Sequence, residues 1–454
     1  MLQIDTEKSD TLDTKACDLA PQQPDIAQGT VHGTAENSPY TEAENRTVLR
    51  KIDWFLLPWL MGTYLIQFVD KTCISYAALW GMKQEAHLVG DQYSWLTTIF
   101  YLGYLVGEFP MNVLFQKVHI TRSCGTLMNE QPLRTGIWFS MNGIAQVVGG
   151  IVAYGIGHIK SDIPVYKFPF LIFGSVTVVW AVPFFLFAAP SPAAAKWLSS
   201  AEKDVAIKRV SENKTGLDNK EFKFYQAREA FMDPQVWILI LFVIANNIPN
   251  GGISAFGPLI IEGFGYSKLG TTLLGMPFGG AQVVALLITG FLAGTIKNCR
   301  IILMCGGLVI AILGMSLMYA LPEENKIGRL LGYYLAIGFS ATYVLSLGLI
   351  QANIAGRTKK TVVTAALFIA YCVGNLIGPQ LFFEREEPHY RSGFIAMIIC
   401  LALDFVLLVI LHRLYVLKNK KRDAAKSSIE VNLDGTSGLT DLTDMENPSF
   451  RYVV

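Results

Sequence analysis

Runs of about 20 apolar residues recur along this chain, and a run of that length crosses a membrane as one helix. Backbone polar groups in lipid must be satisfied within the spanning segment, which favours helices. Only 16% of the 454 residues are charged, against about a quarter in soluble domains. The chain is therefore predicted to be an all-α polytopic membrane protein. Ten spans are expected, at 54–79, 93–116, 136–158, 168–189, 235–261, 270–294, 300–320, 330–351, 361–383 and 393–416.

Polar segments divide these spans into two helical bundles, of four and six spans. The segment at 190–233 contains a plausible amphipathic helix, AEKDVAIKRVSENK, and is expected to be a cytosolic linker. The terminal segments have few aromatic residues and many polar ones, which is typical of disordered tails. The predicted division is a tail at 1–50, a first bundle at 51–189, the linker at 190–233, a second bundle at 234–417 and a tail at 418–454.

Basic residues are distributed unevenly between the loops. If the amino terminus is cytoplasmic, the inner loops carry clusters such as Arg357, Lys359 and Lys360, whereas the outer loops carry isolated residues. An excess of lysine and arginine marks cytoplasmic loops. We therefore expect a multi-pass protein of the plasma membrane with both termini in the cytoplasm.

Several classes of function lack the residues they would need. The formal net charge of +1 gives no reason to expect nucleic acid as a partner. The seven cysteines form no CxxC pair and lie mostly in apolar runs, so they predict small buried side chains and no metal site. Neither a phosphate-binding G-x-x-x-x-G-K-[ST] loop nor a G-x-S-x-G turn occurs. The chain is thus expected to be neither an ATP-driven pump nor an enzyme, to need no cofactor, and to be a secondary transporter.

Charged residues inside the spans are costly and point to functional positions. Asp70 and Lys71 are adjacent in the first span, so they point about 100° apart on a helix and need not pair with each other. They are candidates for coupling or gating, or for a buried ion pair that locks two helices. Glu108 shares a face with Asn112 in the second span and is a third candidate, as a proton site or as part of a structural ion pair.

Amides and a tyrosine recur at spacings of four residues, which place both members of a pair on one helix face. They are predicted to bind solute through hydrogen bonds, which suits carboxylate, ureido or amide groups and suits hard metal ions poorly. Pro249 and the following Asn-Gly-Gly either interrupt the fifth span, which would free backbone groups for a solute, or only kink it. The candidate substrate-binding residues are Gln67, Asn142, Gln146, Asn246, Asn250, Tyr371 and Asn375.

Three stretches resemble the fungal allantoate permease family, which belongs to the anion:cation symporters of the major facilitator superfamily. They are EQPLRTGIWFSMNGIAQVVGG (130–150), NNIPNGGISAFGPLIIEGFGYS (246–267) and AGRTKKTVVTAALFIAYCVGNLIGPQLF (355–382). The resemblance covers roughly residues 50–420. It implies two six-helix bundles, alternating access and proton-coupled uptake of small organic anions such as allantoate, ureidosuccinate, nicotinate or pantothenate. A monomer in contact with membrane lipids is expected.

The chain departs from that family pattern after its second span. FQKVHITRSCGTLMNEQPLRTG runs directly into the first of the three motifs, where the resemblance implies a third and a fourth helix. Two spans with their loops would need about 50–60 residues. A skipped exon or a faulty gene model is the expected explanation. The prediction is therefore a two-bundle fold with ten helices, which either transports by proton symport or is a non-transporting product, such as a regulatory isoform.

Overall fold

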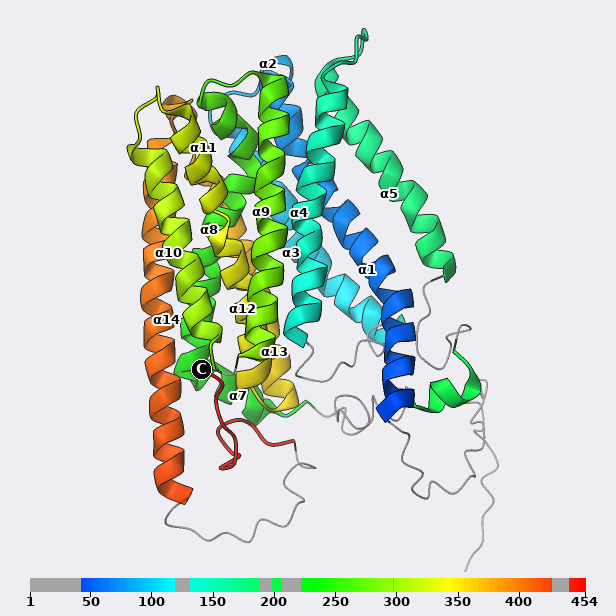
Figure 1. Ribbon diagram of the computed structural model, residues 1–454, viewed down its shortest axis with the longest axis vertical. Coiled ribbons are helices and arrows are strands. Elements are labelled where there is room, and N and C mark those ends of the chain that lie inside the picture. Colours follow the sequence, from blue (N-terminus) through cyan, green and yellow to red (C-terminus); the bar gives the residue numbers. More distant parts are fainter. Residues whose placement is uncertain (1–41, 119–130, 188–197, 206–221, 297, 427–440) are drawn as a thin grey trace, which may run out of the picture.

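The computed structural model describes residues 42–118, 131–187, 198–205, 222–296, 298–426 and 441–454. Long helices run side by side through the molecule (Figure 1). Four of them precede the linker and are called the N-terminal bundle: α1 (Glu42–Leu79), α3 (Gln92–Val118), α4 (Gln131–Ile156) and α5 (Phe168–Phe187). The C-terminal bundle consists of α8 (Pro234–Gly263), α9 (Lys268–Thr295), α10 (Arg300–Ala320), α11 (Lys326–Leu335), α12 (Gly338–Asn353), α13 (Arg357–Gln380) and α14 (Arg391–Lys426).

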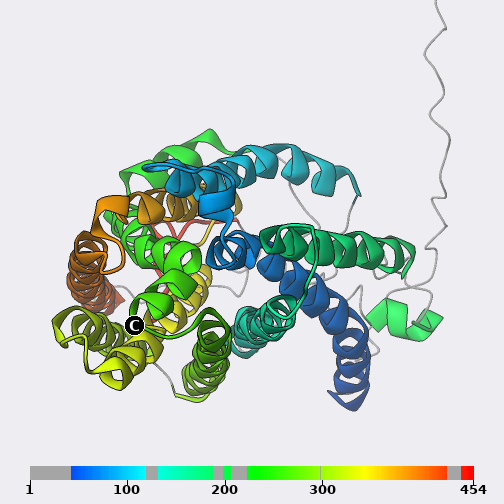
Figure 2. The same ribbon diagram turned by 90° about the horizontal axis from the view of Figure 1, so that it is seen from above.

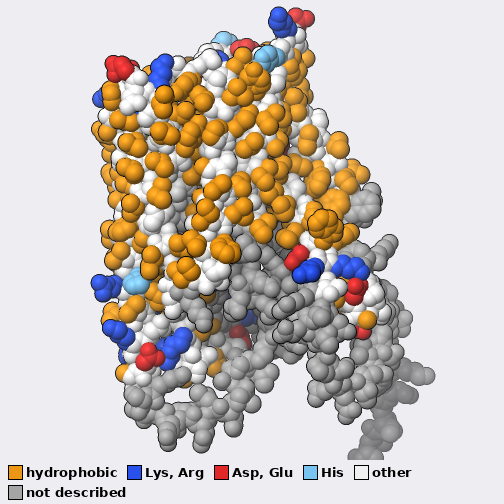
Figure 3. Space-filling model, viewed as in Figure 1, with side chains coloured by type: hydrophobic (Ala, Val, Ile, Leu, Met, Phe, Trp, Pro, Cys, Tyr) orange, Lys and Arg blue, Asp and Glu red, His pale blue; other side chains and the backbone are white. Residues whose placement is uncertain are grey.

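These helices confirm the predicted membrane architecture. Nine stretches within the described residues are long and apolar enough to cross a membrane, and α3 corresponds to the remaining predicted span at 93–116. Figure 3 shows hydrophobic side chains over the sides of the helices and charged side chains gathered near both ends. An apolar belt between polar ends is what a lipid bilayer requires.

A glycine repeat explains the most extensive helix pair, α4 against α9. Every seventh residue of α4 along this contact is a glycine. A Cβ atom on Gly150 would lie 2.9 Å from the carbonyl oxygen of Thr272, and one on Gly143 would collide with the carbonyl oxygen of Gly279. Small residues let helices approach closely where lipid gives no hydrophobic drive for association. The repeat comprises Gly136, Gly143 and Gly150 of α4 and Gly157, which directly follows the helix.

The fifth predicted span is not interrupted, so that alternative was wrong. α8 is helical from Pro234 to Gly263, with Pro249 and Pro258 inside it. Its glycines serve close packing: a Cβ atom on Gly251 would lie 2.7 Å from the Asn375 carbonyl oxygen on α13. The Pro-Asn-Gly-Gly sequence therefore allows α8 and α13 to touch without opening the helix.

A break occurs in a different span. The predicted span at 330–351 consists of two helices, α11 and α12, which meet at residues 336–337. Gly332 and Gly338 flank the break, and each lies against a glycine of α10, Gly314 and Gly307 respectively. Discontinuous helices in transporters often mark the solute site, and α12 begins beside the cavity described below.

The terminal boundaries also differ from those predicted. α1 begins at Glu42 and α14 extends to Lys426, so both helices continue into segments predicted as tails. In the linker, α7 (Phe224–Met232) and residues 200–205 are helical; the rest of the predicted amphipathic helix, like residues 1–41, lies outside the described residues. Residues 441–454 pack against the C-terminal bundle, and we call them the C-terminal strap.

Buried ionic and amide contacts hold this strap. The Lys359 ammonium lies 2.7 Å from Asp444, 2.9 Å from Asp233 and 2.9 Å from Glu229, and Lys359, Asp233 and Asp444 are fully buried. The Asn353 side chain donates to the Val453 carbonyl (2.8 Å) and accepts from its amide (2.7 Å). The strap thus joins α7 and α8 to the ends of α12 and α13, although its composition is typical of a tail.

Asp444→Asn is expected to lower the free energy of unfolding by about 1–3 kcal/mol, because the buried Lys359 ammonium and the Tyr452 hydroxyl (2.7 Å) lose an ionised partner. Thermal unfolding of purified protein in detergent measures the change. Asp423→Asn is the matched control, since that carboxylate is exposed and pairs with Arg451 at the surface; it should change stability by less than about 1 kcal/mol. A loss of less than about 1 kcal/mol with Asp444→Asn would show that the buried contacts of the strap do not stabilise the fold.

Candidate solute-binding cavity

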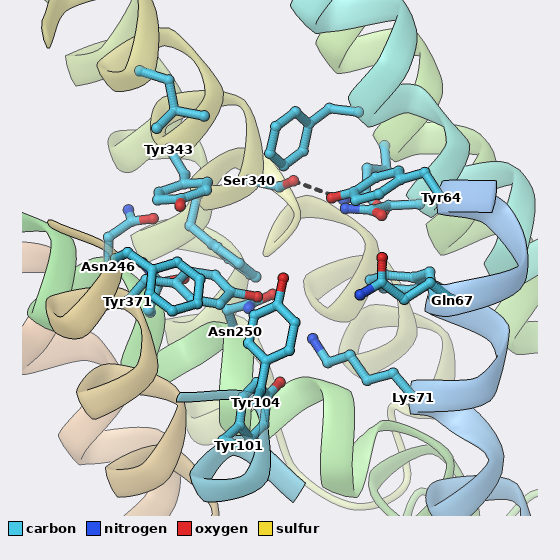
Figure 4. Close-up of a pocket in the computed structure, with 18 of the residues that line it drawn as sticks. Tyr64, Gln67, Lys71, Tyr101, Tyr104, Asn246, Asn250, Ser340, Tyr343 and Tyr371 are labelled. Carbon is cyan, nitrogen blue, oxygen red and sulfur yellow. Dashed lines mark hydrogen bonds between the residues drawn. The ribbon is translucent and has the colours of Figure 1, made fainter. Parts of the chain in front are cut away.

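A cavity of about 280 Å³ lies where the two bundles meet, enclosed by polar and aromatic side chains (Figure 4). Both bundles contribute to its wall. From the N-terminal bundle come Tyr64, Gln67, Phe68, Lys71, Phe100, Tyr101, Tyr104, Trp138, Phe139 and Asn142. From the C-terminal bundle come Asn246, Asn247, Asn250, Gln282, Phe339, Ser340, Tyr343, Leu347, Phe368 and Tyr371.

Lys71 supplies the charge in this cavity. Its side chain extends from α1 toward the space bordered by Tyr104 and Asn250 (Figure 4). The ammonium nitrogen lies 5.1 Å from the ring centroids of Phe68 and of Tyr101. Within the described residues no carboxylate pairs with it, so its positive charge is balanced only by the faces of aromatic rings, which carry negative potential.

Amides and hydroxyls form the polar part of the wall. The Gln282 amide of α9 donates to the Ser340 hydroxyl of α12 at 2.7 Å. The Asn250 amide donates to the Asn375 side-chain oxygen at 2.8 Å, and that contact orients Asn250 on the cavity wall. Neither side-chain atom of Asn246 has a hydrogen-bond partner among the described residues. Asn246 is fully buried within this wall, so its amide keeps hydrogen-bonding capacity that the described residues do not use.

Six of the ten predicted site residues lie on the cavity wall: Gln67, Lys71, Asn142, Asn246, Asn250 and Tyr371. Asn375 is fully buried one layer behind Asn250 and bonds to it. Gln146 lies on α4 next to α9, where its Cβ faces Gly279. Three other members of the predicted set do not line the cavity: Gln146, Asn375 and Asp70.

Asp70 is separated from Lys71 by the geometry of α1. Its carboxylate accepts a hydrogen bond of 2.6 Å from the Thr177 hydroxyl of α5, a helix that contributes no residue to the cavity wall. The two adjacent charges therefore do not pair, as expected from their angular separation. Glu108 belongs to α3, but its side chain lies outside the described residues.

Eleven of the twenty wall residues are aromatic, and of these only Tyr371 was predicted from the sequence as a site residue. The Tyr64 and Trp138 rings lie 4.3 Å apart, and the Tyr343 and Tyr371 rings 5.7 Å apart. Helical spacing could have identified several of them, because Tyr64 precedes Gln67 by three residues and Trp138 precedes Asn142 by four. These rings can stack on a planar solute while the amides bind its polar atoms.

A solute-sized cavity between two bundles of membrane helices defines the class of protein: a membrane transporter. The sequence profile of the Major Facilitator Superfamily matches residues 126–379. A transporter of Schizosaccharomyces pombe is 37% identical over 94% of this chain and 92% of its own length. The chain therefore belongs to the Major Facilitator Superfamily and is a secondary transporter, not an enzyme.

Two relatives from Saccharomyces cerevisiae have names that refer to solutes or pathways. Its allantoate permease is 32% identical to this chain, covering 92% of this chain and 88% of the permease. Its thiamine pathway transporter is 29% identical, covering 93% of this chain and 88% of that transporter. The two names differ in the solute that they indicate, although the identities are similar.

The alignments also contain positions that this chain lacks. The alignment with the S. pombe transporter spans 482 residues, whereas 94% of this chain amounts to about 427, so about 55 aligned positions have no residue here. The superfamily match begins at residue 126, after the second predicted span. The helix that precedes this point in the sequence, α3, packs along α13 and lies apart from α5 (Figure 2).

Proposed function

We propose that this transporter imports a small organic anion together with protons, as its resemblance to the allantoate permease family implies. The Lys71 ammonium carries the proposal, because it projects into the cavity and has no carboxylate partner among the described residues. An ammonium held in low dielectric without a counter-ion attracts an anion. A carboxylate that enters the cavity provides that counter-ion.

The rest of the wall suits a solute with further polar groups. Asn142 and Asn250 come from the two bundles, and both line the cavity. Amide groups can donate to carboxylate and ureido oxygens and accept from ureido N–H groups. Allantoate and ureidosuccinate carry both kinds of group, whereas nicotinate offers a flat ring to the tyrosines. Pantothenate is the fourth solute in the proposed class.

The supporting relative is the allantoate permease of S. cerevisiae, whose alignment extends over most of this chain. The proposal includes the arrangement expected from the sequence: a monomer in the plasma membrane with both termini in the cytoplasm. Because both bundles line the same cavity, closure of the bundles around a bound solute would give alternating access.

Cells that lack their own permeases and express this chain should accumulate at least one of labelled allantoate, ureidosuccinate, nicotinate and pantothenate. Accumulation should fall severalfold when a protonophore collapses the pH gradient, because uptake against a gradient needs the proton. Uptake that ignores the pH gradient would exclude symport, and uptake of none of the four solutes would exclude the proposed substrate class.

A second candidate function follows from the missing aligned positions. If two helices that line or flank the cavity are absent, the chain is a non-transporting product of a transporter gene. The gap of about 55 positions favours this alternative. Transcript reads across codons 117–130 separate the two candidates. Reads that contain about 55 further codons would assign transport to the longer product. If no such reads occur, this chain is the expressed product, and the uptake measurement above applies to it.

A further inference from the structure

An aspartate within α14 has no counter-ion in the described part of the chain. Asp404 is fully buried, and within the described residues neither of its carboxylate oxygens accepts a hydrogen bond. A carboxylate in such surroundings has neither a charged partner nor a well-formed hydrogen bond, and a buried acid in that position binds a proton instead. The proposed function has not used this residue.

The helices around Asp404 offer no compensating charge. α14 packs against α8 and α10. Residues 235–261 of α8 and 301–320 of α10 contain no acidic or basic side chain. Apart from Asp404 itself, the titratable side chains in these parts of α8 and α10 and in residues 400–408 of α14 are Cys305, Tyr319 and Cys400. The Cys400 thiol lies near the Asp404 carboxyl group. No charged side chain in these parts of α8 and α10 therefore compensates the ionised form.

One polar side chain connects Asp404 with the cavity. The Asn246 amide lies beside the Asp404 carboxyl group, and Asn246 also lines the cavity. Neither Oδ1 nor Nδ2 of Asn246 meets hydrogen-bonding geometry with a described residue. Its amide is therefore free to turn either its donor or its acceptor toward Asp404.

We propose that Asp404 binds the coupling proton and that Asn246 transmits its protonation state to the anion site. When Asp404 is protonated, its O–H donates to Asn246 Oδ1, and the Asn246 NH₂ group faces the cavity, where it can donate to an anion. When Asp404 is ionised, it accepts from that NH₂ group, and Asn246 Oδ1 faces the cavity and repels an anion. On protonation an O–H bond of a hydronium ion breaks, the Asp404 O–H bond forms and water is left; on release the Asp404 O–H bond breaks and a water molecule takes up the proton.

This mechanism rests on the proposed anion site and explains how the two cargoes are coupled. A proton on Asp404 favours anion binding, and by linkage a bound anion favours the proton by the same factor. Asp404 is inaccessible to solvent in this structure. A proton bound to it therefore does not exchange with water in this conformation. Asp70, the acid that sequence reasoning favoured for coupling, bonds to Thr177 and lies outside the cavity wall.

An infrared titration tests the proton site without any solute. Purified wild-type protein should show the C=O band of a protonated carboxyl group near neutral pH, and Asp404→Asn should remove it. Asp70→Asn is the rival variant and should leave the band in place. The proposal is overturned if Asp404→Asn leaves the band unchanged, or if Asp70→Asn removes it. Gel filtration confirms that each variant is folded and monodisperse.

Binding of labelled allantoate at different pH values tests the connection to the cavity. Wild-type affinity should fall on the order of 10-fold from pH 6 to pH 8, because Asp404 loses its proton. Asp404→Asn should show almost no pH dependence. Asn246→Leu should keep the infrared band and lose the pH dependence; if it keeps both, the transmission through Asn246 is wrong. Absence of allantoate binding at every pH would refute the proposed function, while the infrared band would still decide whether Asp404 holds a proton.

Discussion

Lys71→Met is expected to weaken binding of a small carboxylate by about 10- to 100-fold. Methionine fills similar space without the charge, and an ion pair at 4 Å is worth about 4 kcal/mol at an effective dielectric constant near 20. Part of that energy offsets desolvation of both charges. The remaining 1.4–2.8 kcal/mol or so corresponds to the expected range of affinity. Equilibrium binding of labelled allantoate to purified protein measures the loss.

Two further variants make the Lys71 result specific. Lys71→Arg keeps the positive charge and should retain more affinity than Lys71→Met. Lys268→Met removes an exposed lysine at the start of α9, outside the cavity wall, and should leave affinity unchanged. If Lys71→Met binds allantoate as well as wild type does, the ammonium is not the anion-binding group.

Gly143→Ala should destabilise the contact between the two bundles by about 1–3 kcal/mol, as overpacked interiors do. The added Cβ atom would meet the Gly279 carbonyl oxygen, which belongs to the backbone of α9 and cannot rotate away. α4 and α9 must then move apart along their whole contact. Thermal unfolding in detergent measures the loss, and solute uptake should fall because the bundles no longer close around the cavity.

Gly280→Ala is the matched control for that substitution. A Cβ atom on Gly280 meets nothing within 4 Å, and alanine is the better helix former by about 0.5–1 kcal/mol. The control is therefore expected to stabilise the protein slightly, so the two substitutions should act in opposite directions. Stabilisation by both would contradict the close approach of α4 and α9.

Hydropathy predicted the membrane helices well, because burial in lipid is a property of each segment on its own. The direction of a side chain is different, since it depends on which helix packs on which face. Helical spacing correctly separated Asp70 from Lys71. Nothing in the sequence indicates that the Thr177 hydroxyl donates a hydrogen bond to Asp70. The same limit applies to Asn375, which bonds to Asn250 behind the wall.

Helix interruptions and terminal tails were harder to predict, because they too depend on packing against other segments. Pro249 and its glycines have the composition of a break, yet packing against Asn375 keeps α8 continuous. The break at residues 336–337 contains no proline, and close contact with glycines of α10 accompanies it. The strap has the composition of a solvated segment, but Asp444 is buried with Lys359. Each outcome depends on partners more than 80 residues away in sequence or on a neighbouring helix.

Nicotinate and nicotinamide provide the most direct test of the anion site, because they share a ring and differ in charge. Equilibrium binding of both to purified protein, with and without Lys71→Met, isolates the contribution of the ammonium. We expect nicotinate to bind at least about tenfold more tightly than nicotinamide, and Lys71→Met to remove that preference. Equal affinity of the wild-type protein for the acid and the amide would contradict a cavity built to hold an anion.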